Sequence, residues 1–256
     1  SLEGTDLDKL ALSTEKLLAG TDSKITTIGY YCNPIQYAEH RKTLENVICT
    51  AGEFGATHVS TFAGAWEGKP VESAYEEFGK VFRELADLAE EKGVKLGIEN
   101  CLMDGTWEHA TCNIGFNPKA WEVMFEEVKN DNFGLEWEPT HQMVQLIDPV
   151  TELRKWCKKI VHIHGKDATI DWDAVRHSGI SGAVPFVWHR MPGFGDTNWR
   201  DIISILRSNG YEDDICIEGY HDPVYSGELE MTGQLHALNY LKWCRGGDFT
   251  PTPWAK

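Results

Sequence analysis

Residues 134–141 read GLEWEPTH, and this stretch decides how the rest of the chain is interpreted. Because side chains alternate across a strand, Leu135 and Trp137 point to one face while Glu136 and Glu138 point to the other. A carboxylate that faces a protein interior is costly unless it is paired or bound to a metal. We therefore expect a strand with one apolar face, and a partner for Glu138 on its other face.

Short apolar segments alternate along the chain with amphipathic ones, which predicts an α/β protein with a parallel sheet. Six segments rich in β-branched and aromatic residues are predicted strands: 24–32, 56–64, 95–101, 133–139, 160–167 and 214–220. Apolar residues at helical spacing predict helices over 7–19, 72–93, 197–210 and 228–243. The segment 168–197 fits neither pattern and is long for a connection, so we expect a lid or a subunit contact there.

Composition and charge restrict the class of protein. The 256 residues suffice for one α/β barrel and show no break in composition, so a single domain over 1–256 is expected. The net charge of −16 argues against nucleic acid and anionic membranes as partners. No apolar run approaches the roughly 20 residues of a membrane span, and no signal peptide opens the chain. Seven scattered cysteines without a C-x-x-C pair favour reduced thiols and a cytoplasmic location.

Four successive predicted strands end with a side chain that can bind metal, each directly after an apolar residue. Because side chains alternate between the two faces of a strand, all four side chains should point to the same face of the sheet. They lie at the carboxyl ends of the strands, where parallel sheets carry their functional sites. Three carboxylates and one imidazole that converge require a cation. This oxygen-rich set suits Mn²⁺, Co²⁺ or Mg²⁺, and the imidazole favours a transition metal. The four residues are Glu99, Glu138, His164 and Glu218.

Three further residues lie close to these strand ends. Glu136 and His162 come two positions before Glu138 and His164, so parity buries them beneath the metal, where we expect a hydrogen-bonded pair that supports the metal ligands. His141 lies in the turn after Glu138. It could bind the metal or point at the substrate, and we prefer the second interpretation.

Five motifs carry a family resemblance: GIEN (97–100), EPTH (138–141) followed by IDP (147–149), VHIHGKD (161–167), RMPGFGDTNW (190–199) and GY…ICIEGYHDP (210–223). As a set they resemble the sugar phosphate isomerase/epimerase family, the xylose-isomerase-like TIM barrels. The resemblance covers nearly all of 24–243 and matches the family's strands three to eight. It implies a (β/α)8 barrel with six βα units readable here and two strands that would precede Ser1.

The resemblance also implies a metal site. Its ligands would be Glu99, Glu138, His164 and Glu218, holding one divalent ion, with Mn²⁺ favoured and Co²⁺, Mg²⁺ or Zn²⁺ as alternatives. The family usually has Asp where this chain has Glu138, and the extra methylene moves the carboxylate about 1.5 Å outward. The IEGYHDP loop (217–223) has one residue more than expected before its DP, which would displace His221.

By this resemblance the chain would be a metal-dependent isomerase or epimerase of carbohydrate metabolism. Glu99 and Glu218 would move a proton next to the carbonyl of a keto-sugar or sugar derivative, through a metal-stabilised enediolate. His141 would hydrogen-bond a substrate oxygen. Further candidates for substrate binding are Asn100, Lys166 and Arg190. Barrels of this family commonly pair, so we also expect a homo-oligomer.

Other interpretations stay open at this point. The same site could eliminate a group from an inosose or a 3-keto-glycoside, as a dehydratase or lyase. An endonuclease acting on abasic sites shares the barrel, but it needs three zinc ions and an Asp-x-His pair that this sequence lacks. The chain could also be a binding or scaffolding subunit that a partner subunit completes.

Overall fold

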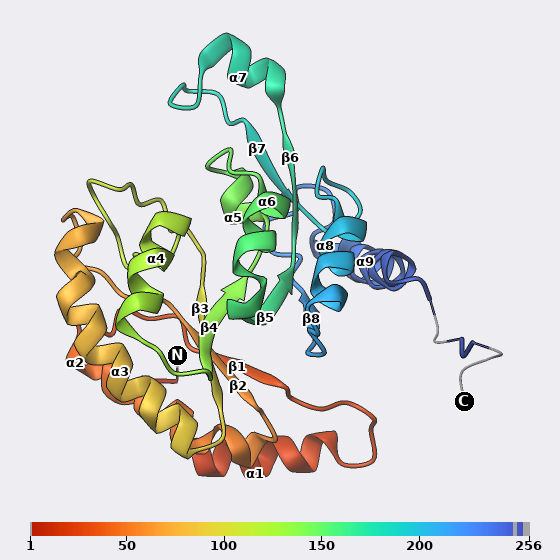
Figure 1. Ribbon diagram of the computed structural model, residues 1–256. Coiled ribbons are helices and arrows are strands. Elements are labelled where there is room, and N and C mark those ends of the chain that lie inside the picture. The colour runs from red at the N-terminus through yellow and green to blue at the C-terminus, as the bar shows by residue number, and fades with distance from the viewer. Residues whose placement is uncertain (1, 248–249, 253–256) are drawn as a thin grey trace. The chain divides into compact units, whose positions relative to one another are not determined.

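The computed structural model describes residues 2–247 and 250–252, and Figure 1 traces them from red to blue. The chain forms two compact units. The first contains the residues up to Gln142 together with Lys159–Ile163, and the second contains Met143–Lys158 and the residues from His164 onward.

All six predicted strands are present, and they belong to one hydrogen-bonded sheet with the order β1-β2-β3-β4-β5-β8. The pairings from β1 through β5 are parallel, which confirms the predicted α/β fold class. The sheet strands are β1 Thr27–Gly29, β2 His58–Thr61, β3 Lys95–Glu99, β4 Phe133–Trp137, β5 Ile160–Gly165 and β8 Ile215–Ile217. Strand β5 begins in the first unit and ends in the second.

The four predicted helices correspond to α1 Leu7–Leu18, α3 Tyr75–Glu91, α8 Trp199–Ser208 and α9 Glu230–Arg245. The structure adds α2 Ala38–Thr50, α4 Pro118–Glu127, α5 Thr140–Met143, α6 Pro149–Trp156 and α7 Trp172–Ser178. An Asp or Asn side chain caps the first turn of several of them, as Asp6 does for α1 and Asn117 for α4. No helix within the described part of the chain has the length and apolar character that crossing a membrane requires.

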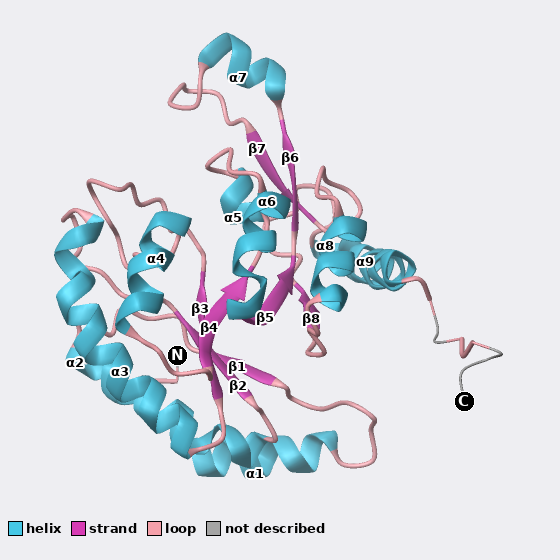
Figure 2. Ribbon diagram, viewed as in Figure 1, coloured by secondary structure: helices cyan, strands magenta, loops and turns pink. Residues whose placement is uncertain are grey.

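The core of the first unit lies between its helices and strands. Figure 2 shows α1, α2 and α3 along one side of the strands. Phe78 and Phe82 of α3 stack with ring centroids 4.6 Å apart, and Phe133 of β4 lies 6.0 Å from Phe82. Because side chains alternate along a strand, the opposite face of β3 and β4 carries Gly97, Glu99, Gly134 and Glu136.

Gly134 allows β4 and β5 to approach closely. A Cβ atom at this position would lie 2.3 Å from the Lys159 carbonyl oxygen and 2.7 Å from Cγ1 of Val161. We expect Gly134→Ala to lower the free energy of unfolding by about 3 kcal/mol or more, because the backbone can yield only by breaking the pairing of β4 with β5. Urea denaturation measures this effect.

The matched control is Gly52→Ala in the first unit, where a Cβ atom meets nothing within 4 Å. That substitution should change the free energy of unfolding by no more than about 0.5 kcal/mol. Equal denaturation midpoints for Gly134→Ala and the wild-type protein would contradict the close approach of the two strands.

The segment 168–197 contains a hairpin that the sequence pattern did not predict. Strand β6 (Asp167–Ile170) pairs with β7 (Val187–Arg190) in antiparallel register, and α7 lies between them. Each strand has only four residues, and their burial does not alternate cleanly, so the signal of a half-buried strand is missing. Whether the hairpin acts as a lid or a subunit contact stays a prediction.

Helix α9 is correctly predicted, but only one residue of the apolar stripe that predicts it is buried. Of that stripe, Met231, Leu235 and Leu238 are exposed, whereas Leu241 is buried together with Gly233 and Ala237. A Cβ atom at Gly233 would lie 2.7 Å from the Cβ of Tyr225. The small residues therefore let the helix backbone come close to its neighbours, which larger apolar residues would prevent.

Candidate functional site

Three glutamates are buried at the carboxyl ends of β3 and β4 in the first unit. Glu99 ends β3 and stands opposite Glu136 of β4, while Glu138 follows β4 directly. Their exposed fractions are 7% for Glu99 and 0% for Glu136 and Glu138. A carboxylate oxygen of Glu99 lies within 4.8 Å of one of Glu138. Carboxylates this close and this far from water favour a cation between them.

Glu136 and His162 are both buried and lie in ion-pair contact, at a separation longer than that of the hydrogen bond that the sequence predicts. Oε1 of Glu136 lies 3.7 Å from Nε2 of His162, and the Tyr31 hydroxyl donates to Oε2 of Glu136 at 2.8 Å. The position of Glu136 along the strand direction differs from the prediction. Glu136 lies directly beside Glu99 in the neighbouring strand and not one layer below it. Parity along a strand determines the face of a side chain, whereas the register between strands determines its level.

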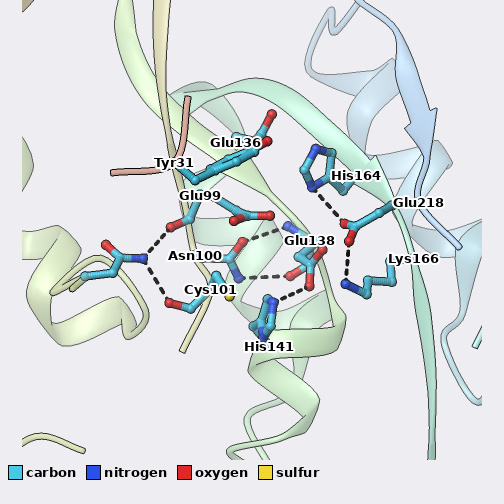
Figure 3. Close-up of polar contacts among 11 residues, drawn as sticks. Tyr31, Glu99, Asn100, Cys101, Glu136, Glu138, His141, His164, Lys166 and Glu218 are labelled. Carbon is cyan, nitrogen blue, oxygen red and sulfur yellow. Dashed lines mark hydrogen bonds and ion pairs between the residues drawn. The ribbon is translucent and has the colours of Figure 1, made fainter. Parts of the chain in front are cut away.

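Asn100 joins the ends of β3 and β4. Its Nδ2 donates to the Glu138 carbonyl at 2.9 Å, and its Oδ1 accepts from the Glu138 amide at 2.8 Å. Figure 3 draws both hydrogen bonds, and the Asn100 side chain is fully buried. The predicted substrate-binding amide thus holds the backbone of Glu138, and through it the position of the Glu138 carboxylate.

Asn113 holds β3 in a similar way, although the sequence analysis did not single it out. Its Nδ2 donates to the carbonyls of Glu99 and Cys101, both at 2.9 Å. Its Oδ1 accepts from the amides of Ala63 at 2.9 Å and Gly115 at 3.0 Å. Nothing in the local sequence distinguishes this asparagine from other loop asparagines, because three of its four described partners lie 12 or more residues away.

His141 contacts Glu138 directly, with Nε2 of the imidazole 2.9 Å from Oε1 of the carboxylate. Figure 3 shows the ring next to Cys101 and Glu138. Burial opposes the charged imidazolium, but the charge of Glu138 and hydrogen bonds with Cys101 and Glu138 outweigh it and raise the pKa of His141 to about 10. His141 therefore neutralises part of the negative charge of the first unit's glutamates.

The raised pKa of His141 predicts how stability depends on pH. Because the folded-state pKa of about 10 exceeds the ordinary value of 6.5, the charged pair with Glu138 stabilises the metal-free protein fully below pH 6.5 and is lost as the pH rises toward 10. We expect the difference in unfolding free energy between the wild-type protein and His141→Gln to be constant below pH 6.5 and to shrink above it. Urea denaturation with a chelator present, at several pH values, measures this difference.

The exposed His177 of α7 offers the matched control for this pH series. His177→Gln should track the wild-type protein at every pH. A stability difference for His141→Gln that grows between pH 6.5 and 10 would contradict a charged pair with Glu138.

In the second unit, His164 and Lys166 both contact Glu218. His164 Nδ1 lies 3.1 Å from Oε2 of the carboxylate, and Lys166 Nζ donates to Oε1 at 2.7 Å. Figure 3 shows both contacts. The Glu218 amide donates to the carbonyl of Gly165 in β5 at 3.0 Å, which fixes the end of β8. Glu218 therefore has one oxygen beside an imidazole and the other beside an ammonium group.

Arg190 is bound to a carboxylate that the sequence analysis did not single out. Its Nε donates to Oδ2 of Asp222 at 3.2 Å, and the same oxygen accepts from the Met191 amide at 2.7 Å. Oδ1 of Asp222 accepts from the amides of Val224 and Tyr225, each at 2.8 Å. Asp222 belongs to the HDP motif (221–223), and its buried carboxylate organises the loop after β8.

The chain is an α/β protein with buried glutamates at the carboxyl ends of the parallel strands β3 and β4, and this arrangement is suited to bind a cation. Residues 5–242 match the family model described as xylose isomerase-like TIM barrel. The chain belongs to this family, which confirms the resemblance noted in its motifs.

Among curated relatives, the chain is similar to an inosose dehydratase of Clostridium tetani, with 26% identity over 182 residues. The match covers 69% of this chain and 57% of that relative, so the chain spans little more than half of the relative's length. Among solved structures, it is similar to a xylose isomerase domain protein from Planctomyces limnophilus, with a TM-score of 0.72, 17% identity, and coverage of 93% of this chain and 83% of that one.

A 3-keto-D-glucoside 4-epimerase from E. coli is also similar in structure, with a TM-score of 0.68 and 14% identity. The match covers 93% of this chain and 86% of the epimerase. At these identities, the likeness to solved structures concerns the fold alone.

Proposed function

We propose that Glu99, Glu138, His164 and Glu218 bind one divalent metal ion. The observation that carries this proposal is the pair of buried carboxylates Glu99 and Glu138 with oxygens within 4.8 Å of each other. His164 and Glu218 add an imidazole and a carboxylate in contact at 3.1 Å. Three oxygen ligands and one nitrogen ligand fit Mn²⁺ best, with Co²⁺, Mg²⁺ or Zn²⁺ as alternatives.

We propose further that both units belong to one barrel domain, that its partner is a small carbohydrate, and that the chain works in the cytoplasm as a homo-oligomer. The family match across both units supports the single domain.

The segment 168–190 supports self-association. It exposes Trp172, Ile180 and Trp188. Its two acidic and two arginine residues cancel in charge, whereas the chain as a whole has a net charge of −16. A second copy would meet little repulsion there. Sedimentation of the wild-type protein and of Ile180→Glu tests this interface.

The proposed reaction begins with removal of a proton from the carbon next to a substrate carbonyl. When bound, a divalent ion polarises that carbonyl and so acidifies the adjacent carbon. Glu218 is the proposed base, and Lys166 at 2.7 Å orients its carboxylate. Glu99 is the second carboxylate that can carry a proton. His141 holds the carboxylate of Glu138, and Asn100 holds its backbone.

The proposed outcome is elimination, which makes the chain a lyase of the dehydratase type acting on an inosose or a 3-keto-glycoside. The name of the Clostridium tetani relative supports this choice. Isomerisation or epimerisation of a keto-sugar is the second candidate, supported by the epimerase with the similar fold. The two reactions share the first proton abstraction and differ in whether the neighbouring C–O bond breaks.

Incubation of the Mn²⁺-loaded protein in D₂O with an inosose, a 3-keto-glucoside and a ketose tests the proposal. We expect deuterium at the carbon next to the carbonyl, and a rise in enone absorbance with one of the first two compounds. Interconversion of keto-sugars without absorbance change would favour the second candidate. Absence of deuterium incorporation with every compound, relative to the chelated protein, would refute the proposed proton abstraction.

A further inference from the structure

The base of the β6–β7 hairpin is fixed to the loop that follows β8, within the second unit. The Met191 amide and Arg190 Nε, at the end of β7, both donate to Oδ2 of Asp222 in that loop. A Cβ atom at Gly219 would lie 2.0 Å from Cε of Met191, so the loop backbone and the Met191 side chain are in close contact. The hairpin therefore ends on the loop whose first residue is Glu218.

This anchoring brings two histidines together. His189 directly precedes Arg190 in β7, and His221 directly precedes Asp222 in the loop after β8. Their ring centroids lie 5.8 Å apart, with the rings at 82° to each other. His221 is exposed, and it adopts a left-handed backbone with φ of 71° that histidine tolerates better than most residues. His189 is half-buried.

Elimination has a chemical requirement that epimerisation lacks. A hydroxyl group leaves poorly as hydroxide, so a positioned acid must protonate it as its C–O bond breaks. Lys166 and Arg190 are already bound to the carboxylates of Glu218 and Asp222. An imidazole gains and loses a proton near neutral pH, which suits the task. His189 carries an imidazole, and the ring of the solvent-exposed His221 lies beside it.

We propose that His189 is the general acid that protonates the departing oxygen, and that His221 returns a proton from solvent to His189. This inference rests on the proposed lyase function. A carboxylate of the site takes the proton from the carbon next to the carbonyl, and the electron pair of that C–H bond forms the new C=C bond. The neighbouring C–O bond breaks, His189 gives its proton to the oxygen, and water leaves. The carboxylate then releases its proton to solvent, so one enone and one water form without any further reactant.

The test separates proton abstraction from loss of the leaving group. His189→Asn and His221→Asn, loaded with Mn²⁺, are incubated with an inosose in D₂O, and deuterium in the recovered substrate is measured beside enone formation. We expect His189→Asn to lower enone formation by about 10²-fold or more while deuterium incorporation persists, and His221→Asn to lower it less. The matched control, His177→Asn in α7 between the two hairpin strands, should leave both rates unchanged.

A second substrate shows whether His189→Asn fails because of chemistry or because of folding. An analogue with fluoride in place of the departing hydroxyl needs no proton on its leaving group. His189→Asn should therefore eliminate fluoride at nearly the wild-type rate.

Wild-type elimination of the inosose by His189→Asn would overturn the inference while leaving the proposed function intact. An equal loss of deuterium incorporation and of both eliminations, at unchanged metal content, would also overturn it. If the wild-type protein gives neither deuterium incorporation nor enone, the proposed function itself fails, and the inference fails with it.

Discussion

Glu138→Gln should weaken the binding of Mn²⁺ by more than the roughly 10–100-fold typical for loss of a residue that hydrogen-bonds to a metal ligand without binding the metal itself. The two hydrogen bonds of Asn100 hold the backbone of residue 138, so the substituted side chain stays in the same place. What is lost is one negative charge and the second carboxylate oxygen. The main effect of the substitution is therefore electrostatic, and it should not depend on a rearrangement of β4.

Isothermal titration calorimetry and thermal unfolding can both measure this loss. A ligand at 100 times its dissociation constant adds about 2.7 kcal/mol to the free energy of unfolding. The wild-type protein should gain this stabilisation from Mn²⁺, and Glu138→Gln should lose most of it at the same metal concentration.

Two further variants make the result specific to the proposed ligand. Glu126→Gln, on the exposed side of α4, should bind Mn²⁺ as the wild-type protein does. Glu136→Gln removes an equally buried charge that is not a proposed ligand, and should weaken binding by only about 10–100-fold. If Glu138→Gln retained wild-type affinity, or if Glu136→Gln had the larger effect, the assignment of Glu138 as a ligand would be wrong.

Glu218→Gln should lower the rate of deuterium incorporation into substrate by about 10³-fold, within the range that a positioned acid or base contributes. The glutamine amide cannot accept the proton that the carboxylate is proposed to remove. It also removes the carboxylate charge that Lys166 contacts, at 2.7 Å from Oε1 in the structure. Mass spectrometry of the recovered substrate measures the rate.

Because Glu218 is also a proposed ligand, the experiment needs excess Mn²⁺ and a measured metal content for each sample. Glu228→Gln, an exposed glutamate ten positions further along the same loop region, is the matched control and should retain the wild-type rate. Deuterium incorporation at the wild-type rate by metal-loaded Glu218→Gln would assign the proton transfer to another group, with Glu99 as the next candidate.

Several features of the site lay beyond sequence analysis. The sequence pattern suggested Asn100 as a substrate-binding residue, but it gave no sign that the Asn100 side chain hydrogen-bonds the backbone of Glu138. Asp222 was visible only as part of a motif, although its carboxylate accepts hydrogen bonds from Arg190 and from the Met191 amide, 32 and 31 residues away. Hydrogen-bond partners that lie 30 or more residues apart leave no periodic signal in a sequence, so they cannot be found from spacing.

The sequence by itself determined the six strands and the family. These features depend on local properties, namely β-branched and apolar runs, the two-residue period of a strand and motifs of a few residues. The tertiary structure alone decided the level of Glu136 beside Glu99, the contacts of His141 with Cys101 and Glu138, and the meeting of His189 with His221. These depend on the register between strands and on loop packing, which are set by contacts between distant parts of the chain and not by the periodicity of any one segment.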